Sequence, residues 1–281
     1  MRRPALIIAA VIPPSVQPWA RVDASRLRAV RGVLTDIDDT LTTEGQVPLG
    51  VVAALAALRE DGLPVVAVTG RPMGWSRPLA EELPLAAVVA ENGAVALFRE
   101  DGALRIEYAQ GETVRAANRA RLDAAAARIL SQLPEATLAR DSGGRVTDIA
   151  VDHAEFAHLS VAAIERVVAL MEEAGMTATV SSIHVNGWYG AHSKLSGATW
   201  LVERLFGRDL EAERGHWIYV GDSTNDQAMF AAFPLSVGVA NLADFAAQLT
   251  QWPAFITRHD RGRGFIEVAE ALLEARATER R

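Results

Sequence analysis

The chain has 281 residues, half of them apolar and 22% charged, which suits one large or two smaller globular domains and excludes a disordered chain, a collagen and a coiled coil. The net charge of −7, with no dense run of Lys or Arg, disfavours nucleic acid as a partner, and no apolar run reaches the roughly 18 residues of a membrane-spanning helix. The absence of cysteine excludes disulfides, zinc thiolates and cysteine nucleophiles, and it is consistent with a cytoplasmic protein.

Residues 1–30 are interpreted as an N-terminal extension. An apolar stretch over 5–12 follows two arginines, as in a short signal peptide, but Pro13 and Pro14 interrupt it early and no small-residue cleavage site follows. A loosely attached extension or a wrongly assigned start codon is favoured, so the folded domain is expected to begin near Arg31.

From that point, short apolar runs alternate with helical patterns. Strands are predicted over 33–37, 65–69 and 87–91, and helices over 48–61 and 75–83. Near-continuous apolar strands that alternate with helices indicate a parallel sheet covered on both faces.

The pattern changes over residues 95–186. Helices are predicted over 112–133 and 159–174, a turn over 141–144, and strands over 146–151, 176–183 and 184–189. The alternation then returns, with helices over 193–206, 225–232, 241–249 and 265–275 and strands over 217–220 and 235–239. We therefore predict an α/β fold with a Rossmann-like parallel sheet as its core (31–94 and 187–281) and an inserted α+β cap domain (95–186).

Carboxylates follow two of the predicted core strands, at the edge where open α/β sheets bind ligands. The first strand runs into DIDDT at 36–40, and a later one runs into GDSTND at 221–226. Neither a dinucleotide-binding GxGxxG nor a P-loop is present. Asp36, Asp38 and Asp222 are expected to converge, and because their charges repel they need a cation. An acidic site made only of oxygen ligands suits Mg²⁺.

The same edge suits hydrolysis of a phosphate monoester. Asp36 is placed to act as a nucleophile that forms an aspartyl phosphate, and Asp38 to protonate the leaving alkoxide and then activate water. The Thr69 hydroxyl and the Gly70 N–H can hold phosphate oxygens. Lys194, the one lysine among 28 basic residues, adds a compact positive charge.

These motifs resemble those of the haloacid dehalogenase-like superfamily of phosphatases, in the same order: DIDDT, TGR, a lysine and GDSTND. The resemblance implies that Asp36 is the nucleophile, Asp38 the general acid and base, and Lys194 the superfamily's conserved lysine. The metal-binding residues that we predict from it are Asp36, Asp38, Asp222 and Asp226, the last in the outer shell of the metal. The predicted phosphate-binding residues are Thr69, Gly70, Lys194 and Asn225.

The number of residues between the motifs indicates which branch of the superfamily the chain resembles. Asp36 and Thr69 are 33 residues apart, one βαβ step, whereas Thr69 and Lys194 are 125 apart, which leaves room for a cap. A cap at this place (type IIB), preceded by ENGA at 91–94, resembles the branch of Cof-type sugar phosphatases, sucrose-phosphate phosphatase and mannosyl-3-phosphoglycerate phosphatase.

Several polar residues have both a functional and a structural interpretation. Asp39 is favoured as a turn residue, and Ser223 with Asp226 has the spacing of a capping box. Gly93 is a candidate hinge into the cap. The side chains expected to contact the substrate are Arg71, Glu91, Asn92, His184 and Asn186, although Arg71 can equally brace its loop.

Taken together, the sequence predicts a Mg²⁺-dependent phosphatase that acts on a small phosphorylated metabolite, favouring a sugar phosphate. One alternative is a phosphosugar mutase that returns the phosphoryl group to its substrate. Another is a module without catalysis that holds a phospho-aspartate or binds a sugar phosphate. The sequence does not determine the oligomeric state.

Overall fold

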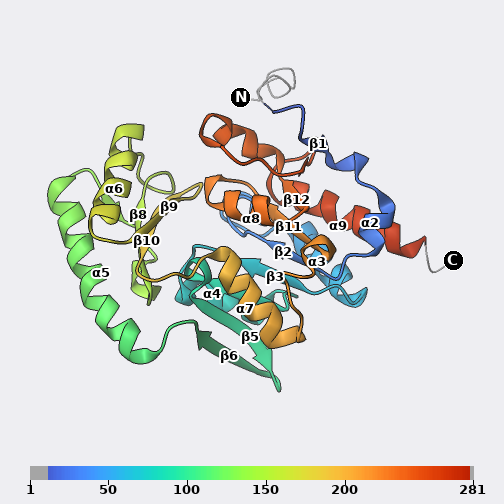
Figure 1. Cartoon of the computed structure of the whole chain (residues 1–281), viewed down its shortest axis with the longest axis horizontal. Coiled ribbons are helices and arrows are strands. Elements are labelled where there is room, and N and C mark those ends of the chain that lie inside the picture. The colour runs from blue at the N-terminus through green and yellow to red at the C-terminus, as the bar shows by residue number, and fades with distance from the viewer. Residues whose placement is uncertain (1–11, 279–281) are drawn as a thin grey trace. The chain divides into compact units, whose positions relative to one another are not determined.

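The computed structural model describes residues 12–278, and its fold is mixed α/β with a large, mainly parallel sheet, as predicted (Figure 1). The apolar stretch considered as a signal peptide lies, except for Ile12, outside the described residues. The chain divides into two compact units, the first with residues up to 67, 83–86 and from 202 onward, the second with 68–82 and 87–201. The division into the core and cap ranges given above stays a prediction.

The first unit is built on a parallel sheet with the strand order β1-β13-β12-β11-β2-β3. Side chains along β2 and β11 are buried throughout, which explains why these strands are continuous apolar runs in the sequence. The strands are β1 (Gln17–Pro18), β2 (Gly32–Thr35), β3 (Val65–Val68), β11 (Trp217–Gly221), β12 (Leu235–Gly238) and β13 (Phe255–Ile256).

Helices α3 and α9 of this unit pack against each other, and α2 packs against α9. In α3, Val51, Leu55 and Leu58 share one face and are fully buried. The helix predicted over 241–249 is present as the 3-10 helix η6. The α-helices are α2 (Ala24–Arg28), α3 (Leu49–Glu60), α8 (Gln227–Ala232) and α9 (Arg261–Ala277), and the 3-10 segments are η1 (Trp19–Arg21), η4 (Arg214–His216), η5 (Thr224–Asp226) and η6 (Ala240–Gln248).

Ordered structure begins before Arg31, contrary to our expectation. Strand β1 pairs with β13, and Trp19 is only 1% exposed, with its ring edge-on to Phe255 at a centroid distance of 5.6 Å. The Asp23 side chain accepts a hydrogen bond from Ser25 N and caps α2. This segment consists of short pieces without periodicity, so only its long-range partner on β13 reveals that it belongs to the fold.

We expect Trp19→Ala to lower the free energy of unfolding by about 3–5 kcal/mol, because it removes a large side chain from a closely packed site. Urea unfolding followed by circular dichroism measures the change. The control is Leu49→Ala, since Leu49 is 87% exposed and should change stability by about 0.5 kcal/mol or less. Equal stability of the Trp19→Ala variant and the wild type would show that the N-terminal segment is not part of the core.

The second unit contains an antiparallel arrangement of β4 (Ala87–Ala90), β5 (Val95–Glu100) and β6 (Ala103–Tyr108), with α4 (Met73–Glu82) packed on β4 and β5. The β5–β6 hairpin was not predicted. Its two-residue loop is Asp101-Gly102, both at positive φ, and an Asp-Gly pair between apolar runs is a strong hairpin signal.

The second sheet of this unit is antiparallel, with the strand order β7-β8-β10-β9, and α5 and α6 pack against it (Figure 1). Its core combines Leu122 and Ile129 of α5, Leu170 of α6, and Val151 and Val185 of the sheet. The elements are β7 (Thr137–Leu138), η3 (Ser142–Gly144), β8 (Asp148–Asp152), β9 (Thr177–Val180), β10 (His184–Trp188), α5 (Glu112–Gln132) and α6 (Val161–Glu173). These bounds agree closely with the predicted α+β block.

Gly93, in the segment η2 (Glu91–Gly93), occupies the predicted hinge position and has a φ of +105°, a conformation that favours glycine. A Cβ atom at this position would lie 2.0 Å from the carbonyl oxygen of Ser193, just before α7 (Lys194–Phe206). The chain segments at Gly93 and Ser193 are therefore in close contact, on either side of the region predicted to be the cap. Among residues 12–278, no helix is both long and apolar enough to cross a membrane.

Candidate active site

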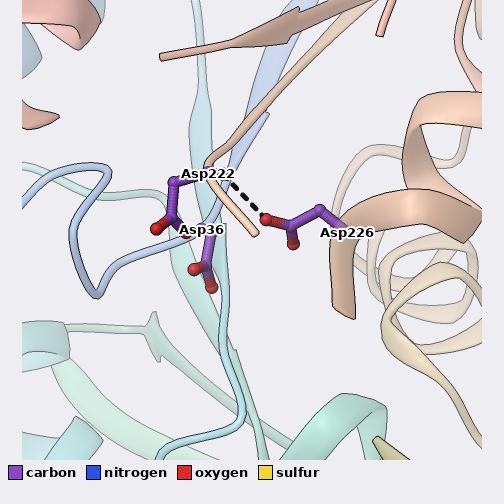
Figure 2. Close-up of side chains that lie close together, drawn as sticks. All are labelled: Asp36, Asp222 and Asp226. Carbon is purple, nitrogen blue, oxygen red and sulfur yellow. Dashed lines mark hydrogen bonds between the residues drawn. The ribbon is translucent and has the colours of Figure 1, made fainter. Parts of the chain in front are cut away.

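Three buried carboxylates come together in the first unit. One oxygen each of Asp36, Asp222 and Asp226 lies within 4.8 Å of the others, and the three residues are 4%, 0% and 0% exposed. Asp36 follows β2 and Asp222 follows β11, and these strands are parallel neighbours in the register Thr35 to Val220. Figure 2 shows this acidic group (Asp36, Asp222 and Asp226), with Asp226 held at the start of the following helix.

Asp226 is fixed in place by its neighbours. Its Oδ2 accepts hydrogen bonds from the N–H groups of Asp222 (2.9 Å) and Ser223 (3.2 Å), and its Oδ1 accepts one from the Tyr219 hydroxyl. The predicted capping box between Ser223 and Asp226 is confirmed. Burial, followed by the nearby carboxylates of Asp226 and Asp36, raises the pKa of Tyr219 well above its ordinary value, so this hydroxyl remains a donor.

The donor set fits a hard divalent cation. It offers only carboxylate oxygens, close together and shielded from water, which matches the preference of Mg²⁺ for oxygen ligands. Both Asp226 oxygens accept hydrogen bonds from the protein. The outer-shell role implied for Asp226 stays a prediction.

Asn241, at the start of η6, was missed in the sequence. Its Nδ2 donates to Asp222 Oδ2 (3.2 Å) and to the Asp39 carbonyl (3.1 Å), and its Oδ1 accepts from Arg261 N (2.9 Å). Asn241 therefore orients one carboxylate of the acidic group. Since it stands just after β12, a search of every strand end would have found it.

The remaining acidic residues of the first motif lie in a turn. Ile37 O accepts N–H groups from three following residues, at 2.9–3.3 Å, which winds the chain tightly after β2. Asp38 is half-buried and is not a member of the acidic group, so its catalytic and metal-binding roles stay predictions. Asp39 has a φ of +54° and its carboxylate accepts from Arg261 Nε at 2.8 Å, as expected of a turn residue.

In the second unit, the end of β3 continues into the turn formed by Thr69, Gly70 and Arg71 (the Thr69–Arg71 turn). Thr69 N–H donates to Val89 O at 2.8 Å, which ties the turn to β4. Thr69 Oγ1 accepts from Arg71 N at 3.0 Å, and the side chain of Thr69 is buried. The Thr69 hydroxyl thus accepts a hydrogen bond from the backbone and can still donate one.

Arg71 braces its loop. Its guanidinium donates to Asp141 Oδ2 (3.1 Å) and Glu155 Oε1 (2.8 Å), and it lies 4.7 Å from the Trp75 ring centroid. Glu155 Oε2 also contacts His184 Nε2 at 2.9 Å. Burial alone would raise the pKa of Glu155, but the hydrogen bond with His184 and the ion pair with Arg71 lower it to about 2.

Other protein groups hydrogen bond to three side chains that we expect to contact the substrate, those of Glu91, Asn92 and Asn186. The Glu91 carboxylate accepts from the N–H groups of Met73, Val146 and Thr147, at 2.6–3.1 Å. The amide Nδ2 atoms of Asn92 and Asn186 lie 3.5 and 3.3 Å from one oxygen of Asp148. Substrate contact by these residues stays a prediction.

Asp148 and Arg145, at the start of β8, were missed in the sequence although they are charged residues beside an apolar run. Arg145 Nη1 lies 2.9 and 3.0 Å from the two Asp148 oxygens, and both side chains are almost fully buried. Burial raises the pKa of Asp148 to about 7, against the pull of Arg145, while the facing carboxylates raise the pKa of Arg145 despite its burial. Arg145 thus stays charged beside Asp148.

Lys194 is the first residue of α7 and is 5% exposed. The helix starts here because the Ser193 hydroxyl accepts the N–H of Ser196 at 3.2 Å. Asn225 lies in η5, where its Oδ1 accepts a hydrogen bond from the Ser223 hydroxyl at 3.0 Å. The roles assigned to Lys194 and Asn225 stay predictions.

Comparison with known proteins supports the class of protein that the motifs indicate. Residues 33–124 match the family described as haloacid dehalogenase-like hydrolase. A phosphoglycolate phosphatase from Methanosarcina acetivorans is 28% identical over 248 residues, covering 86% of this chain and 96% of that protein.

Solved structures share the fold. A protein from Plasmodium vivax described as a HAD/COF-like hydrolase superposes with a TM-score of 0.62 at 18% identity, covering 90% of this chain and 98% of the other. A sucrose-phosphatase from Synechocystis, solved with sucrose and phosphate, superposes with a TM-score of 0.61 at 15% identity, covering 87% and 98%.

The fold and the sequence match define a hydrolase of the α/β class, and the predicted enzyme class, a phosphatase, agrees with the phosphatases among these relatives. The family matched by residues 33–124 is the one that the chain's motifs resemble, and the solved structures agree with it in fold.

The low pKa of Glu155 makes its contribution to stability depend on pH. A carboxyl whose pKa is lower in the folded than in the unfolded state stabilises the fold above the unfolded value of 4.5, and this is lost as the pH falls toward 2. We expect Glu155→Gln to lower the free energy of unfolding by about 2 kcal/mol at pH 7, a value reduced from the full shift for partial exposure, and by progressively less between pH 4.5 and pH 3. Urea unfolding at several pH values measures this, with the exposed Glu165→Gln as control. A difference that does not shrink with acid would contradict the ion-pair assignment.

Proposed function

We propose that this protein is a Mg²⁺-dependent phosphatase that hydrolyses a small phosphorylated metabolite through an aspartyl-phosphate intermediate. The observation that carries the proposal is the acidic group, with its three carboxylates buried within 4.8 Å of one another at the end of β2 and β11. Asp36 and Asp222, with Asp226 behind them, would hold the cation. Bound Mg²⁺ would neutralise the negative charge of the phosphate and position it for attack.

The proposed reaction has two steps. A carboxylate oxygen of Asp36 attacks the phosphorus, the bond from phosphorus to the leaving oxygen breaks, and Asp38 gives its proton to the alkoxide. Asp38, now ionised, takes a proton from water, whose oxygen attacks the phosphorus of the aspartyl phosphate. The bond between Asp36 and phosphorus breaks, which returns the carboxylate and releases inorganic phosphate.

Four further groups are assigned to the phosphate. The hydroxyl of Thr69 has its proton available for donation because its oxygen already accepts from Arg71 N. Gly70 N–H, Asn225 and Lys194 complete the proposed set. Lys194 stands at the start of a 13-residue helix, where the helix dipole and the ammonium both favour an anion.

The proposed substrate is a sugar phosphate. The likeness of the fold to a sucrose-phosphatase supports this, whereas the relative from Methanosarcina is named for phosphoglycolate. A sugar phosphate and phosphoglycolate are both small phosphate monoesters, so a single phosphate-release assay can compare them as substrates. The cytoplasmic location stays a prediction from the sequence.

The test is release of inorganic phosphate from sugar phosphates, phosphoglycolate and nucleotides, with Mg²⁺ or with EDTA. We expect release that needs Mg²⁺ and is concentrated on one or two small substrates. Asp36→Asn should lower kcat at least about a thousandfold, because it removes the nucleophile. Asp39→Asn is the matched control, since this turn carboxylate pairs with Arg261 and is outside the acidic group. Activity retained by Asp36→Asn, or unaffected by EDTA, would refute the mechanism.

Lys194→Arg tests the proposed ammonium–phosphate contact. Lys194 is buried, and a planar guanidinium of the same charge needs more room than a compact ammonium, so we expect kcat/KM to fall at least about tenfold. Steady-state kinetics measure this, and a circular dichroism spectrum like that of the wild type controls for folding. A variant with near-normal kcat/KM would remove Lys194 from the proposed site.

A further inference from the structure

The backbone of the Thr69–Arg71 turn is held by side chains from far along the chain. The carbonyl oxygen of Gly70 accepts hydrogen bonds from Arg145 Nη1 at 3.0 Å and from Asn186 Nδ2 at 3.3 Å. Arg145 precedes β8 and Asn186 lies in β10, both within the second unit. This carbonyl therefore has two donors that are 75 and 116 residues away in sequence.

Both donors are buried and share an acceptor. The side chain of Arg145 is 1% exposed, and Asn186 is 1% exposed. Asp148 Oδ2 accepts from Arg145 at 2.9 Å and from Asn186 at 3.3 Å, and Asp148 is fully buried. Because buried polar groups that are all hydrogen bonded to one another have few alternative arrangements, this network holds both donors in one position.

Two side chains also approach the backbone of the turn closely. A Cβ atom on Gly70 would lie 3.2 Å from Asn92 Oδ1 and 3.3 Å from Asn186 Oδ1. A larger residue at position 70 would therefore press on Asn92 and Asn186.

The hydrogen bonds to the Gly70 carbonyl also restrict the Thr69 hydroxyl, because one peptide plane connects the two groups. The Gly70 carbonyl and the Arg71 N–H belong to the same planar peptide group, so fixing one end fixes the other. Arg71 N–H donates to Thr69 Oγ1 at 3.0 Å. With that lone pair occupied, the hydroxyl of Thr69 is oriented to donate its proton elsewhere.

We infer that Arg145 and Asn186 are positioning residues that orient the Thr69 hydroxyl toward phosphate by holding the carbonyl of Gly70. This inference rests on the proposed function, which assigns the turn to phosphate. It differs from the prediction that Asn186 contacts the substrate, because here Asn186 acts through the peptide plane and not on the ligand.

The variant that tests this is Asn186→Ala, which removes one donor to Gly70 and leaves Arg145 in place. Asn118→Ala is the matched control, since Asn118 is also buried in the second unit and its amide donates to Gln110 Oε1 at 3.2 Å, away from the turn. For Asn186→Ala we expect kcat/KM to fall about tenfold and the inhibition constant of inorganic phosphate to rise about tenfold, the effect of one hydrogen bond. Asn118→Ala should stay within about twofold of the wild type in both.

A double-mutant cycle separates positioning from a general structural role. In a Thr69→Val background, where no hydroxyl remains to be oriented, Asn186→Ala should change kcat/KM and phosphate inhibition less than about twofold. A full tenfold effect in that background would overturn the inference, as would an Asn186→Ala variant that behaves like the wild type. If Asn186→Ala does not fold, Asn186→Ser is measured by the same criteria, because its shorter hydroxyl cannot bridge Gly70 and Asp148.

The two proposals fail in different ways. A folded wild type that releases no phosphate from any substrate overturns the proposed function and this inference with it. An active wild type whose Asn186→Ala variant is unchanged overturns this inference alone.

Discussion

The mutual repulsion of three buried carboxylates is the constraint on which the site depends. Parallel pairing of β2 with β11 forces Asp36 and Asp222 side by side, so the repulsion is built in by the backbone of the sheet. Tyr219 and two backbone N–H groups then hold Asp226 against them. In a buried site such charges are stabilised only by protons, by donors or by a cation. The pairing of the strands thus keeps the three carboxylates close together, and a bound cation would lower the repulsion among them.

The acidic group could be largely predicted from the sequence because its geometry follows from local rules. Apolar runs mark parallel strands, and the residues after them lie at one edge of the sheet. The sequence alone therefore predicts that Asp36 and Asp222 meet there. The capping box of Ser223 and Asp226 likewise depends on residues three apart. The same reasoning places Asp38 among the metal ligands, and because Asp38 is not one of the three carboxylates of the acidic group, that role stays a prediction.

Features that depend on distant partners could not be predicted. Trp19 is buried because β1 pairs with β13, which is more than 200 residues away, and no periodicity in residues 17–28 indicates it. Arg145 and Asp148 appear in the sequence as two ordinary charged residues, and only the fold shows that both are buried and paired. Tyr219 occupies a position in β11 that any large apolar residue could fill, so its role as a donor to Asp226 has no local signal.

Two residues that the sequence assigns to the substrate, Glu91 and Asn186, also hydrogen bond to the protein, and their contact with a substrate stays a prediction. Glu91 binds three backbone N–H groups, and Asn186 binds the carbonyl of Gly70. Only a few hydrogen-bond donors contact a bound phosphate, so the orientation of each donor matters. The buried groups packed around the donors set that orientation. If the Thr69–Arg71 turn binds phosphate as proposed, Arg145 and Asn186 would orient it through the Gly70 carbonyl and need not touch the phosphate themselves.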